Sequence, residues 1–471
     1  MAKENLILLA DAYKYSHHKL YYPGTTQVYS YLESRGGKFD STVFYGLQYF
    51  LKEYLCGPAF SQADLDAAKN FLPQVFGRDD VFDPSRFQYI LDTYNGHLPV
   101  RIKAVPEGTE VPVSNVLMTI ENTDPKCFWL TNFLETLLMQ VWYPCTVATI
   151  SKEVRKVVAQ YHQETATPGS EAGIDFVLND FGFRGVSSVE SAGLGGSAHL
   201  LNFRGSDTLA GSVFAQRYYK AQEVYGLSIP ATEHSICTLL GKAGEADIYR
   251  HILDTFPTGV VACVSDSYNI FDACAQYWGT EFKNQILERD GRLVIRPDSG
   301  DPAMTLLKVF DILFERFGFA TNEKGYKVLP PQVRVIQGDG VNYDSIKAIY
   351  ARLKAHGISA ENLVLGMGGA LLQKLDRDTQ KFALKCSYAK LNGKDTVVQK
   401  SPTEMDADGN ITGSFKKSKG GRLKLIHRNG HFETVPETSH PEWEDQLQTV
   451  FENGHLLNEQ TFEVLRQRSA L

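Results

Sequence analysis

The stretch GRLVIRPDSGDPAMTLLKVFDIL, residues 291–313, decides the fold class. It begins with a continuous apolar run, passes through polar residues and glycine, and continues with apolar residues at a helical period. Such a run is typical of a strand buried on both faces, and the periodic segment is typical of a helix that covers it. The same pattern recurs at residues 258–278, 333–353 and 361–375. The repetition predicts parallel βα units, hence a barrel or a doubly wound sheet.

Polar residues stand at the carboxyl ends of these predicted strands, where ligands bind in parallel α/β folds. Arg296 and Asp298 are two residues apart at one strand end, so both side chains project from the same side. An arginine can neutralise a phosphate while a carboxylate takes hydroxyl groups or a metal. Asp339 lies between two glycines at the next strand end. These residues predict one sugar-phosphate site; the alternative is an ion pair with a helix cap.

Two glycine-rich stretches are open to phosphate-binding interpretations. In VLGMGGALLQKL, residues 364–375, glycines separate a predicted strand from a predicted helix, and Arg377 stands about two turns along that helix. Free backbone N–H groups there can bind an anion, although a tight turn also needs glycine. AGLGGSAHLLNF, residues 192–203, matches the dinucleotide pattern G-x-G-x-x-A, but polar residues precede it. We therefore expect a helix with a face of small residues there.

Two further motifs each allow a structural and a functional interpretation. NDFGFRGVSS, residues 179–188, is either a packed turn or a platform that holds a flat ring beside an anion. His234 in ATEHSICT is either structural or catalytic, and no neighbouring His or carboxylate spacing makes it a metal ligand.

Composition narrows the class of protein. The chain has 471 residues, 43% hydrophobic and 22% charged, and a net charge of -7, which indicates a folded globular protein of about two domains and disfavours nonspecific nucleic-acid binding. Seven scattered cysteines form no C-x-x-C pair, so we expect a reducing compartment. The apolar run LILLA is too short for a signal peptide, and polar residues interrupt the apolar segment 129–150. We expect a cytoplasmic protein without a membrane span.

The N-terminal part has a different pattern. Residues 25–35 and 97–123 alternate between apolar and polar side chains and contain Pro and Gly turns. This pattern is typical of antiparallel strands, and it predicts a second domain.

In order along the chain, these motifs resemble one family, the nicotinamide phosphoribosyltransferases among the type II phosphoribosyltransferases. The resemblance begins at LADAYKYSHHKLYYPGTTQVYSYLESR (residues 9–35) and continues through NDFGFRGVSSVESAGLGGSAHLLNFRGSDTLAG (179–211), ATEHS, VSDSYNI and IRPDSGDP. It goes on through VIQGDGVNYDSI and GMGGALLQKLDRD (366–378) and ends at FALKCSYA (382–389). It implies an irregular (β/α) barrel over residues 146–384. It also implies a mixed, mainly antiparallel β domain built from residues 1–145 and 385–471. Members are homodimers with shared active sites.

The resemblance also implies the reaction. The family joins nicotinamide to phosphoribosyl pyrophosphate with Mg2+, releases pyrophosphate, and couples this step of NAD salvage to ATP through a phosphohistidine. Phe181 would stack on the pyridine ring, with Tyr13 of the partner subunit on its other face. Arg184 would hold the pyrophosphate side, and Asp207 would bind the amide. Phe183, two residues beyond Phe181, is expected to point the other way into the core.

The remaining roles concern phosphate and ribose. His234 matches the phosphorylated histidine, and Asp266 would orient it. Arg296 and Asp298 would bind the ribose-phosphate and pyrophosphate. The nucleotide would be lined by Gly338, Asp339, Gly368 and Gly369, with Arg377 on its phosphate, and further phosphate cations would be Arg35, Lys385, Lys400 and Lys416. No resident metal site is expected apart from Mg2+ carried with the substrate.

Two alternatives remain open. A nicotinate phosphoribosyltransferase would share most of these motifs, but the Asp207 carboxylate would repel nicotinate and accept a hydrogen bond from nicotinamide. A noncatalytic binding protein of the same fold is expected to have lost His234, Arg296 or Asp298, and all three are present.

Overall fold

We analysed a computed structural model, which describes residues 4–400, 403–405, 408–413 and 418–470. The chain divides into two compact units, each with its own sheet. Unit 1 comprises Met1–Thr146, Tyr218–Lys220 and Asp376–Leu471, and unit 2 comprises Val147–Arg217 and Ala221–Leu375.

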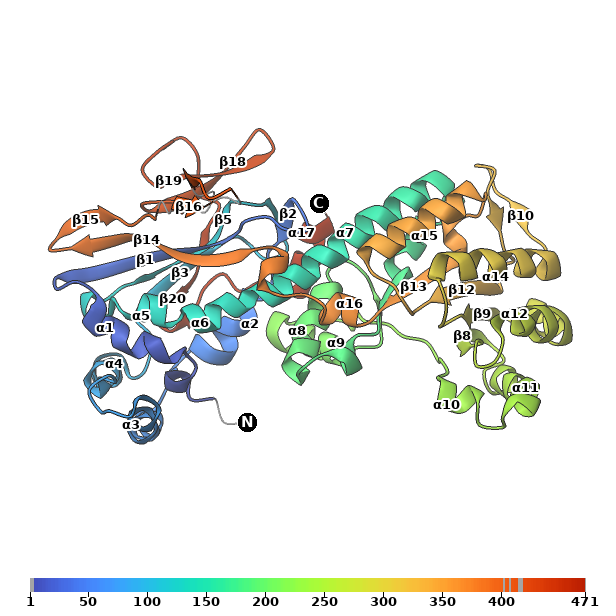
Figure 1. Ribbon diagram of the computed structural model, residues 1–471, viewed down its shortest axis with the longest axis horizontal. Helices are drawn as coiled ribbons and strands as arrows, with labels where there is room; N and C mark the ends of the chain where they lie inside the picture. The colour runs from blue at the N-terminus through green and yellow to red at the C-terminus, as the bar shows by residue number, and fades with distance from the viewer. Residues whose placement is uncertain (1–3, 401–402, 406–407, 414–417, 471) are drawn as a thin grey trace. The chain divides into compact units, whose positions relative to one another are not determined.

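Unit 2 is built on a six-stranded parallel sheet (Figure 1). In spatial order its strands are β7 (Gly205–Ser206), β6 (Leu178–Asp180), β13 (Leu363–Met367), β12 (Val333–Gln337), β9 (Gly291–Arg296) and β8 (Gly259–Val264). Val333, Val335, Leu293 and Ile295 are fully buried, as expected for strands covered on both faces. The prediction of parallel βα units is confirmed.

One short segment, residues 227–232, borders both edges of this sheet. Leu227 bridges to Gly205 on the β7 edge, and Ala231 bridges to Ala262 on the β8 edge. The Leu227 N–H donates to the Arg204 carbonyl at 2.7 Å, and the Ala262 N–H donates to the Pro230 carbonyl at 2.9 Å. Because the same segment satisfies the backbone groups of both edge strands, the sheet curls into an irregular barrel, as the resemblance implies.

Helices cover the outside of this barrel. They are α8 (Val189–His199), α9 (Leu209–Tyr219), α10 (His234–Cys237), α11 (Glu245–Thr255), α12 (Ile270–Asp272), α13 (Lys283–Glu288), α14 (Pro302–Phe317), α15 (Tyr343–Ala355) and α16 (Gly369–Leu372), with the π-helix η9 (Ala273–Glu281). The helix α7 (Trp142–Thr165) lies beside α15 in Figure 1, and Tyr161 stacks on Tyr350 with ring centroids 5.3 Å apart. Asp301 caps α14, since its carboxylate accepts from the Met304 N–H at 2.8 Å.

The glycines of the G-x-G-x-x-A match lie inside α8, as expected of a helix with a face of small residues. A Cβ on Gly196 would lie 3.0 Å from the Cα of Gly211 in α9, and a Cβ on Gly211 would lie 2.6 Å from the Gly196 backbone. The small residues therefore permit close packing of α8 and α9.

The helix expected after β13 is shorter than the sequence indicates. The helix α16 ends at Leu372, and Arg377 begins a separate 3-10 turn, Arg377–Thr379. Asp376 caps that turn, since its Oδ1 accepts from the Asp378 N–H at 2.9 Å and the Thr379 N–H at 2.8 Å. The prediction that Arg377 lies two turns along the helix is therefore wrong.

Unit 1 contains a seven-stranded antiparallel sheet (Figure 1). In spatial order its strands are β15 (Lys394–Val397), β14 (Phe382–Leu391), β1 (Thr25–Ser34), β5 (Val116–Asn122), β3 (Val100–Ala104), β20 (Gln448–Glu452) and β21 (His455–Leu456). The sheet therefore joins N-terminal and C-terminal strands, which confirms the expected mixed β domain.

Smaller elements complete unit 1. Its helices are α1 (His17–Leu20), α2 (Leu47–Phe50), α3 (Gln62–Phe76), α4 (Pro84–Tyr94), α5 (Leu130–Phe133), α6 (Glu135–Leu138) and α17 (Phe462–Ala470). Its two-stranded pairs are β2 (Ser41–Val43) with β4 (Glu110–Pro112), β16 (Thr403–Met405) with β17 (Ile411–Gly413), and β18 (Leu423–Arg428) with β19 (His431–Pro436). Across the described part of the chain, no helix has the length and apolar character needed to cross a membrane.

Candidate functional site

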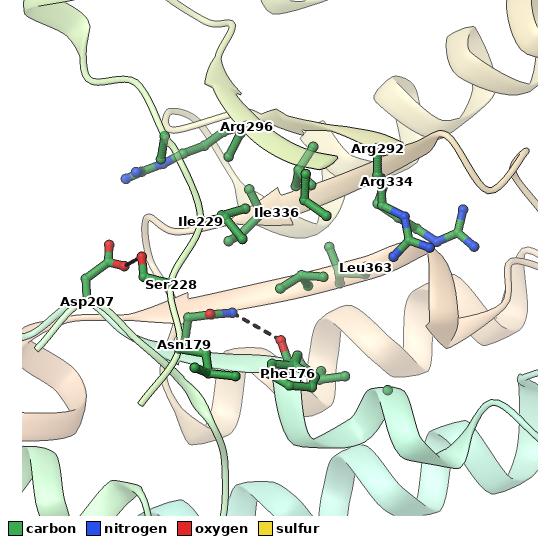
Figure 2. Close-up of a pocket in the computed structure, with 18 of the residues that line it drawn as sticks. Phe176, Asn179, Asp207, Ser228, Ile229, Arg292, Arg296, Arg334, Ile336 and Leu363 are labelled. Carbon is green, nitrogen blue, oxygen red and sulfur yellow. Dashed lines mark hydrogen bonds between the residues drawn. The ribbon is translucent and has the colours of Figure 1, made fainter. Parts of the chain in front are cut away.

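A cavity of about 610 Å³ lies inside the barrel of unit 2, a size typical of small-molecule sites. In Figure 2, Ile229, Ile336 and Leu363 form its apolar middle. Asp207, Ser228 and Arg296 lie at one end, and Arg292 and Arg334 lie at the other. The cavity can therefore receive a flat apolar ring and offers polar groups at both ends.

Phe181 and Arg296 form one polar corner of this cavity. The Arg296 guanidinium lies 5.5 Å from the centre of the Phe181 ring, and its Nε and Nη2 bond to the Asp298 carboxylate at 3.1 and 2.9 Å. The ring and the salt bridge hold the guanidinium in place. The corner thus combines a ring face, a cation and a carboxylate.

Two glycines make this corner possible. A Cβ on Gly366 would lie 2.1 Å from a carbon of the Phe181 ring, and a Cβ on Gly338 would lie 3.1 Å from the Arg296 guanidinium. Any larger residue at Gly366 would displace the ring. These glycines therefore serve close approach of side chains, and the Phe181 ring also packs against the buried cluster of Ala262, Val294 and Ile336.

Asp207 presents its carboxylate to the same cavity. Its Oδ1 accepts a hydrogen bond from the Ser228 hydroxyl, and its backbone N–H donates to the Asp180 carbonyl at 2.9 Å. Ser228 belongs to the segment that borders both sheet edges, so closure of the barrel and orientation of Asp207 depend on the same residues. The carboxylate is exposed and retains acceptor capacity for a ligand.

A chain of hydrogen bonds connects His234 to the Arg296 corner. His234 Nε2 lies 3.1 Å from Asp266 Oδ1, and Asp266 Oδ2 accepts from the Asp298 N–H at 3.1 Å. The Asp266 side chain is 4% exposed, whereas that of His234 is 50% exposed. A buried carboxylate thus orients an accessible imidazole and also fixes the loop that carries Asp298.

The turn after Phe181 lies beside the glycine turn after β13. A Cβ on Gly185 would lie 3.8 Å from the Cα of Gly369, and a Cβ on Gly368 would lie 3.4 Å from the Phe181 carbonyl oxygen. Arg184 is exposed in this turn, and Asp339 is exposed at the end of the neighbouring strand β12. The structure therefore brings Arg184, Gly368 and Gly369 together in unit 2.

The prediction that Phe183 has a core role is wrong. Its side chain is 38% exposed, because residues 183–185 form a 3-10 turn and the alternation of a strand does not apply.

A buried carboxylate supports both binding segments. Asp180 is fully buried, and its Oδ1 accepts from the Gly182 N–H at 2.7 Å. Its carbonyl accepts from Asp207, as described above, so one residue ties the Phe181 turn to the Asp207 segment. Burial raises the pKa of Asp180 to about 6.

The far end of the cavity holds groups that the sequence did not single out. Burial lowers the pKa of Arg334 to about 10, and its Nη1 donates to the Pro330 carbonyl at 2.9 Å and the Val333 carbonyl at 2.7 Å. Arg292 Nε donates to the Pro331 carbonyl at 2.8 Å. Burial also lowers the pKa of His162 to about 4, so this imidazole is neutral near pH 7.

The expected phosphate cations form a separate cluster in unit 1. Burial lowers the pKa of Lys385, and the nearby charges of Arg35, Lys400 and Arg377 lower it further. Arg35 Nε donates to Glu33 Oε1 at 2.6 Å, while its Nη2 is buried without a hydrogen-bond partner among the described residues. This concentration of positive charge suits an anion.

Tyr13, Arg377 and Lys416 are the remaining residues for which the sequence predicts a binding role. Tyr13 is 57% exposed in unit 1, where its ring meets His17 edge-on. Arg377 is exposed and lies 3.1 Å from Asp378 Oδ1. Lys416 lies outside the described residues.

No group of three or more His, Cys, Asp or Glu side chains poised for a metal occurs in the described ranges. Mg2+ commonly binds to one or two carboxylates together with substrate phosphates. Asp298 and Asp339, at the ends of adjacent strands β9 and β12, have the oxygen donors for such a shared site.

Sequence reasoning missed Ser228 and Asp180 as parts of the site, and it assigned Gly366 to a possible anion-binding turn, whereas the structure shows it packed against Phe181. Ser228 lies in a segment without a clear strand pattern, and the role of Gly366 depends on where the Phe181 ring falls. Only the position of Asp180 at the end of a short strand before Phe181 could have signalled it.

A parallel barrel that carries arginine and carboxylate side chains at the carboxyl ends of its strands, beside a cavity, has the arrangement of an enzyme active site. Comparison with known proteins gives the family. The model of the nicotinate phosphoribosyltransferase (NAPRTase) family matches residues 176–455, and that of the nicotinamide phosphoribosyltransferase N-terminal domain matches residues 5–102. The chain belongs to the nicotinate phosphoribosyltransferase family, and it is an enzyme of the pentosyltransferase class.

Similar full-length proteins have been assigned a narrower name. The chain is 47% identical to a nicotinamide phosphoribosyltransferase of Xanthomonas campestris, over 98% of this chain and 97% of the relative. It is 31% identical to a nicotinamide phosphoribosyltransferase of Acinetobacter baylyi, over 98% of this chain and 96% of the relative. These relatives support a role in NAD biosynthesis.

Solved structures share the fold. The chain matches the nicotinate-nucleotide pyrophosphorylase of Pyrococcus furiosus with a TM-score of 0.60, 14% identity, and coverage of 100% of this chain and 96% of that one. It matches human nicotinic acid phosphoribosyltransferase with a TM-score of 0.55, 16% identity, and coverage of 98% and 93%. The fold is therefore that of the type II phosphoribosyltransferases.

Proposed function

We propose that the enzyme joins nicotinamide to phosphoribosyl pyrophosphate and releases nicotinamide mononucleotide and pyrophosphate. The observation that carries this proposal is the presence of the Phe181 ring, the Asp207 carboxylate and the Arg296 guanidinium around one cavity. An aromatic face, an amide acceptor and a cation are the three groups that a pyridine carboxamide and a phosphorylated ribose require. The nicotinamide phosphoribosyltransferases at 47% and 31% identity support the same reaction.

The choice of base depends on Asp207. Its carboxylate accepts from the amide NH2 of nicotinamide, whereas the carboxylate of nicotinate would face a like charge. The hydrogen bond from Ser228 holds the Asp207 carboxylate in its orientation toward the cavity. We therefore infer a preference for nicotinamide, with nicotinate phosphoribosyltransferase as the second candidate, favoured only by the family description.

The chemistry needs stabilised charge rather than a base. The ring nitrogen of nicotinamide carries a free electron pair, so it attacks the anomeric carbon without losing a proton, while the bond to pyrophosphate breaks. The departing pyrophosphate gains negative charge and the sugar gains positive charge. In unit 2, Arg296 and Arg184 would stabilise the negative charge on the departing pyrophosphate. The carboxylate of Asp298 would face the hydroxyl groups of the positively charged sugar. The Phe181 ring fixes the angle of attack.

Mg2+ would be held by Asp298 and Asp339 together with the phosphates of the substrate. When bound there it neutralises charge on the leaving pyrophosphate. The cations of unit 1, Arg35, Lys385 and Lys400, would bind further phosphate oxygens, with Lys416 as a further candidate on sequence grounds. Arg377 would bind the phosphate of the mononucleotide.

His234 is proposed to accept a phosphoryl group from ATP. Its imidazole is half exposed, and Asp266 holds Nε2, which leaves Nδ1 as the nitrogen for phosphoryl transfer. The added negative charge would lie one hydrogen-bonded step from Asp298, where it can organise Mg2+ and the substrate. ATP hydrolysis would thereby couple to mononucleotide formation.

A homodimer is proposed, with Tyr13 of the partner subunit against the face of the pyridine ring opposite Phe181. The exposure of Tyr13 supports this role. Mixing Tyr13→Ala and Asp207→Ala proteins tests it, because a mixed dimer would contain one site without either substitution. Recovery of activity on mixing supports shared sites, and its absence in a demonstrated mixed dimer contradicts them.

The reaction itself is tested by incubating the protein with nicotinamide, phosphoribosyl pyrophosphate and Mg2+, with and without ATP. Mononucleotide formation is expected from both the wild type and His234→Ala. Stimulation by ATP is expected only in the wild type, and stimulation that survives the substitution would refute the phosphohistidine role. A Ser235→Ala control, one residue away in the same helix, should retain stimulation.

A further inference from the structure

Two buried cysteines lie next to the histidine that is proposed to be phosphorylated. Cys237 is the last residue of the helix α10, which begins at His234. Cys263 lies in β8, three residues before Asp266, the partner of His234. Both cysteines are fully buried. The reaction proposed above uses neither of them.

The two thiols share the same neighbours. Cys237 Sγ lies 3.3 Å from Thr232 Oγ1 and 3.2 Å from the Val264 carbonyl oxygen. Cys263 Sγ lies 3.8 Å from Thr232 Oγ1 and 3.5 Å from the same carbonyl oxygen. Both sulfur atoms therefore lie against the same hydroxyl and the same carbonyl oxygen.

The backbone holds this contact. The Thr232 N–H donates to the Ala262 carbonyl at 3.1 Å, and Thr232 Oγ1 accepts from the Val264 N–H at 2.9 Å. The segment that leads into α10 is thus fixed against β8 on both sides of Cys263. A disulfide would therefore form by rotation of the two side chains between backbone segments that are already held together.

The thiols are electrostatically unequal. The neighbouring thiol of Cys263 lowers the pKa of Cys237, whereas burial raises the pKa of Cys263 well above its usual value. One member of the pair thus tends toward the nucleophilic thiolate, and the other stays a thiol. Cys274, also buried, differs, because burial raises its pKa to about 12.

We propose that Cys237 and Cys263 are an oxidation site that closes to a disulfide and restrains His234. With hydrogen peroxide as the oxidant, the Cys237 sulfur attacks one peroxide oxygen, the O–O bond breaks, and a sulfenic acid and one water form. The Cys263 sulfur then attacks the sulfenic sulfur, the S–S bond forms, and the second water leaves. Two thiols and one peroxide thereby give one disulfide and two waters.

The expected consequence concerns ATP coupling, and this part depends on the proposed phosphohistidine. A bond from α10 to β8 ties the helix of His234 to the strand that leads to Asp266. The imidazole then has less freedom to leave Asp266 and meet the phosphoryl donor. Oxidation should therefore abolish stimulation by ATP and leave the mononucleotide formed without ATP within about twofold.

The bond itself can be detected without an activity assay. The full-length protein is treated with hydrogen peroxide at doses that oxidise Met304, which is 55% exposed, and is then digested for mass spectrometry. A peptide linking Cys237 to Cys263, lighter by two hydrogens and split by dithiothreitol, is expected in the wild type and in Cys274→Ser. It is expected to be absent in Cys237→Ser and Cys263→Ser. Free thiols at both positions in the treated wild type would overturn the proposal.

The functional consequence is measured on the same samples. Reversible loss of ATP stimulation in the wild type, with retention in treated Cys263→Ser, supports the restraint of His234. A linked peptide with unchanged stimulation would overturn that restraint. If reduced wild type shows no stimulation at all, the phosphohistidine proposal fails, whereas the linked peptide still tests the oxidation site.

Discussion

The Arg296 and His234 sites of unit 2 and the surroundings of Lys385 in unit 1 are organised in opposite ways. In unit 2, Arg296 is paired with Asp298 and His234 with Asp266. In unit 1, burial and the neighbouring cations both lower the pKa of Lys385. Paired groups keep their geometry without a ligand, whereas like charges gain most when an anion arrives. The first arrangement suits transition-state stabilisation, and the second suits capture of an anionic substrate.

The largest effect should come from removing Arg296. In Arg296→Ala, kcat/KM should fall by about 10²- to 10³-fold, because a positioned cation at the departing pyrophosphate is lost. Steady-state assays of mononucleotide formation measure this change. Arg292→Ala is the matched control, since Arg292 lies on the same strand at the other end of the cavity, and its loss should be far smaller. An equal loss of kcat/KM in the two variants would contradict the assignment of pyrophosphate stabilisation to the Arg296 end of the cavity.

Asp180 sharpens the comparison, because it is the buried carboxylate of unit 2 whose pKa is raised to about 6. In the folded state it binds its proton more tightly than in the unfolded state, so its ionisation costs stability as the pH rises from about 4 to about 6. Above that range the cost is about 3 kcal/mol. Asp180→Asn should therefore raise the free energy of unfolding by up to this amount at pH 8, and not at pH 4.

Denaturant unfolding of both proteins at the two pH values measures this difference. Asparagine keeps an oxygen that can accept from the Gly182 N–H, so the geometry of the turn is preserved. A stability difference that is the same at pH 4 and pH 8 would show that ionisation of Asp180 is not its cause.

Phe181→Ala should have the next largest effect. Loss of the stacking face should raise KM for nicotinamide by about tenfold, with little change in KM for phosphoribosyl pyrophosphate. Phe183→Ala, two residues away and exposed, is the control and should leave both constants close to those of the wild type. A similar rise in the control would mean that disruption of the turn, and not stacking, is responsible.

The smallest effect should come from Lys385 in unit 1. Lys385→Ala should raise KM for phosphoribosyl pyrophosphate by roughly three- to tenfold, and the dependence of KM on salt should weaken. Because the pKa of Lys385 is lowered, its charge is lost at a lower pH than that of an ordinary lysine. KM for this substrate should therefore rise early in the alkaline range, and Lys385→Arg should remove that rise. A fall in kcat at unchanged KM would contradict the prediction that Lys385 acts in binding of phosphoribosyl pyrophosphate.

Much of the fold follows from local patterns, whereas parts of the site do not. The apolar run before Arg296 predicts a strand buried on both faces, which β9 is. The alternation in residues 25–35 predicts a strand correctly, although residues 28–34 of β1 are buried without alternation. The pairing of Arg296 with Asp298 follows from their spacing. Arg377 and Phe183 were misplaced because a capping carboxylate and a 3-10 turn interrupted the expected periodicity.

Long-range contacts explain why the roles of Ser228 and Gly366 in the site could not be predicted from the sequence. Ser228 meets Asp207 only because residues 227–232 border both edges of the sheet. The need for glycine at Gly366 arises from the Phe181 ring, 185 positions earlier in the chain. Such contacts depend on barrel closure, which no local pattern encodes.

The central claim is that Asp207, facing the cavity beside Phe181, selects the amide of nicotinamide. The most direct test is the ratio of kcat/KM for nicotinamide to that for nicotinate, measured for the wild type and for Asp207→Asn. We expect the wild type to prefer nicotinamide by at least about a hundredfold, and the variant to lose most of that preference. Equal or better use of nicotinate by the wild type would contradict the account.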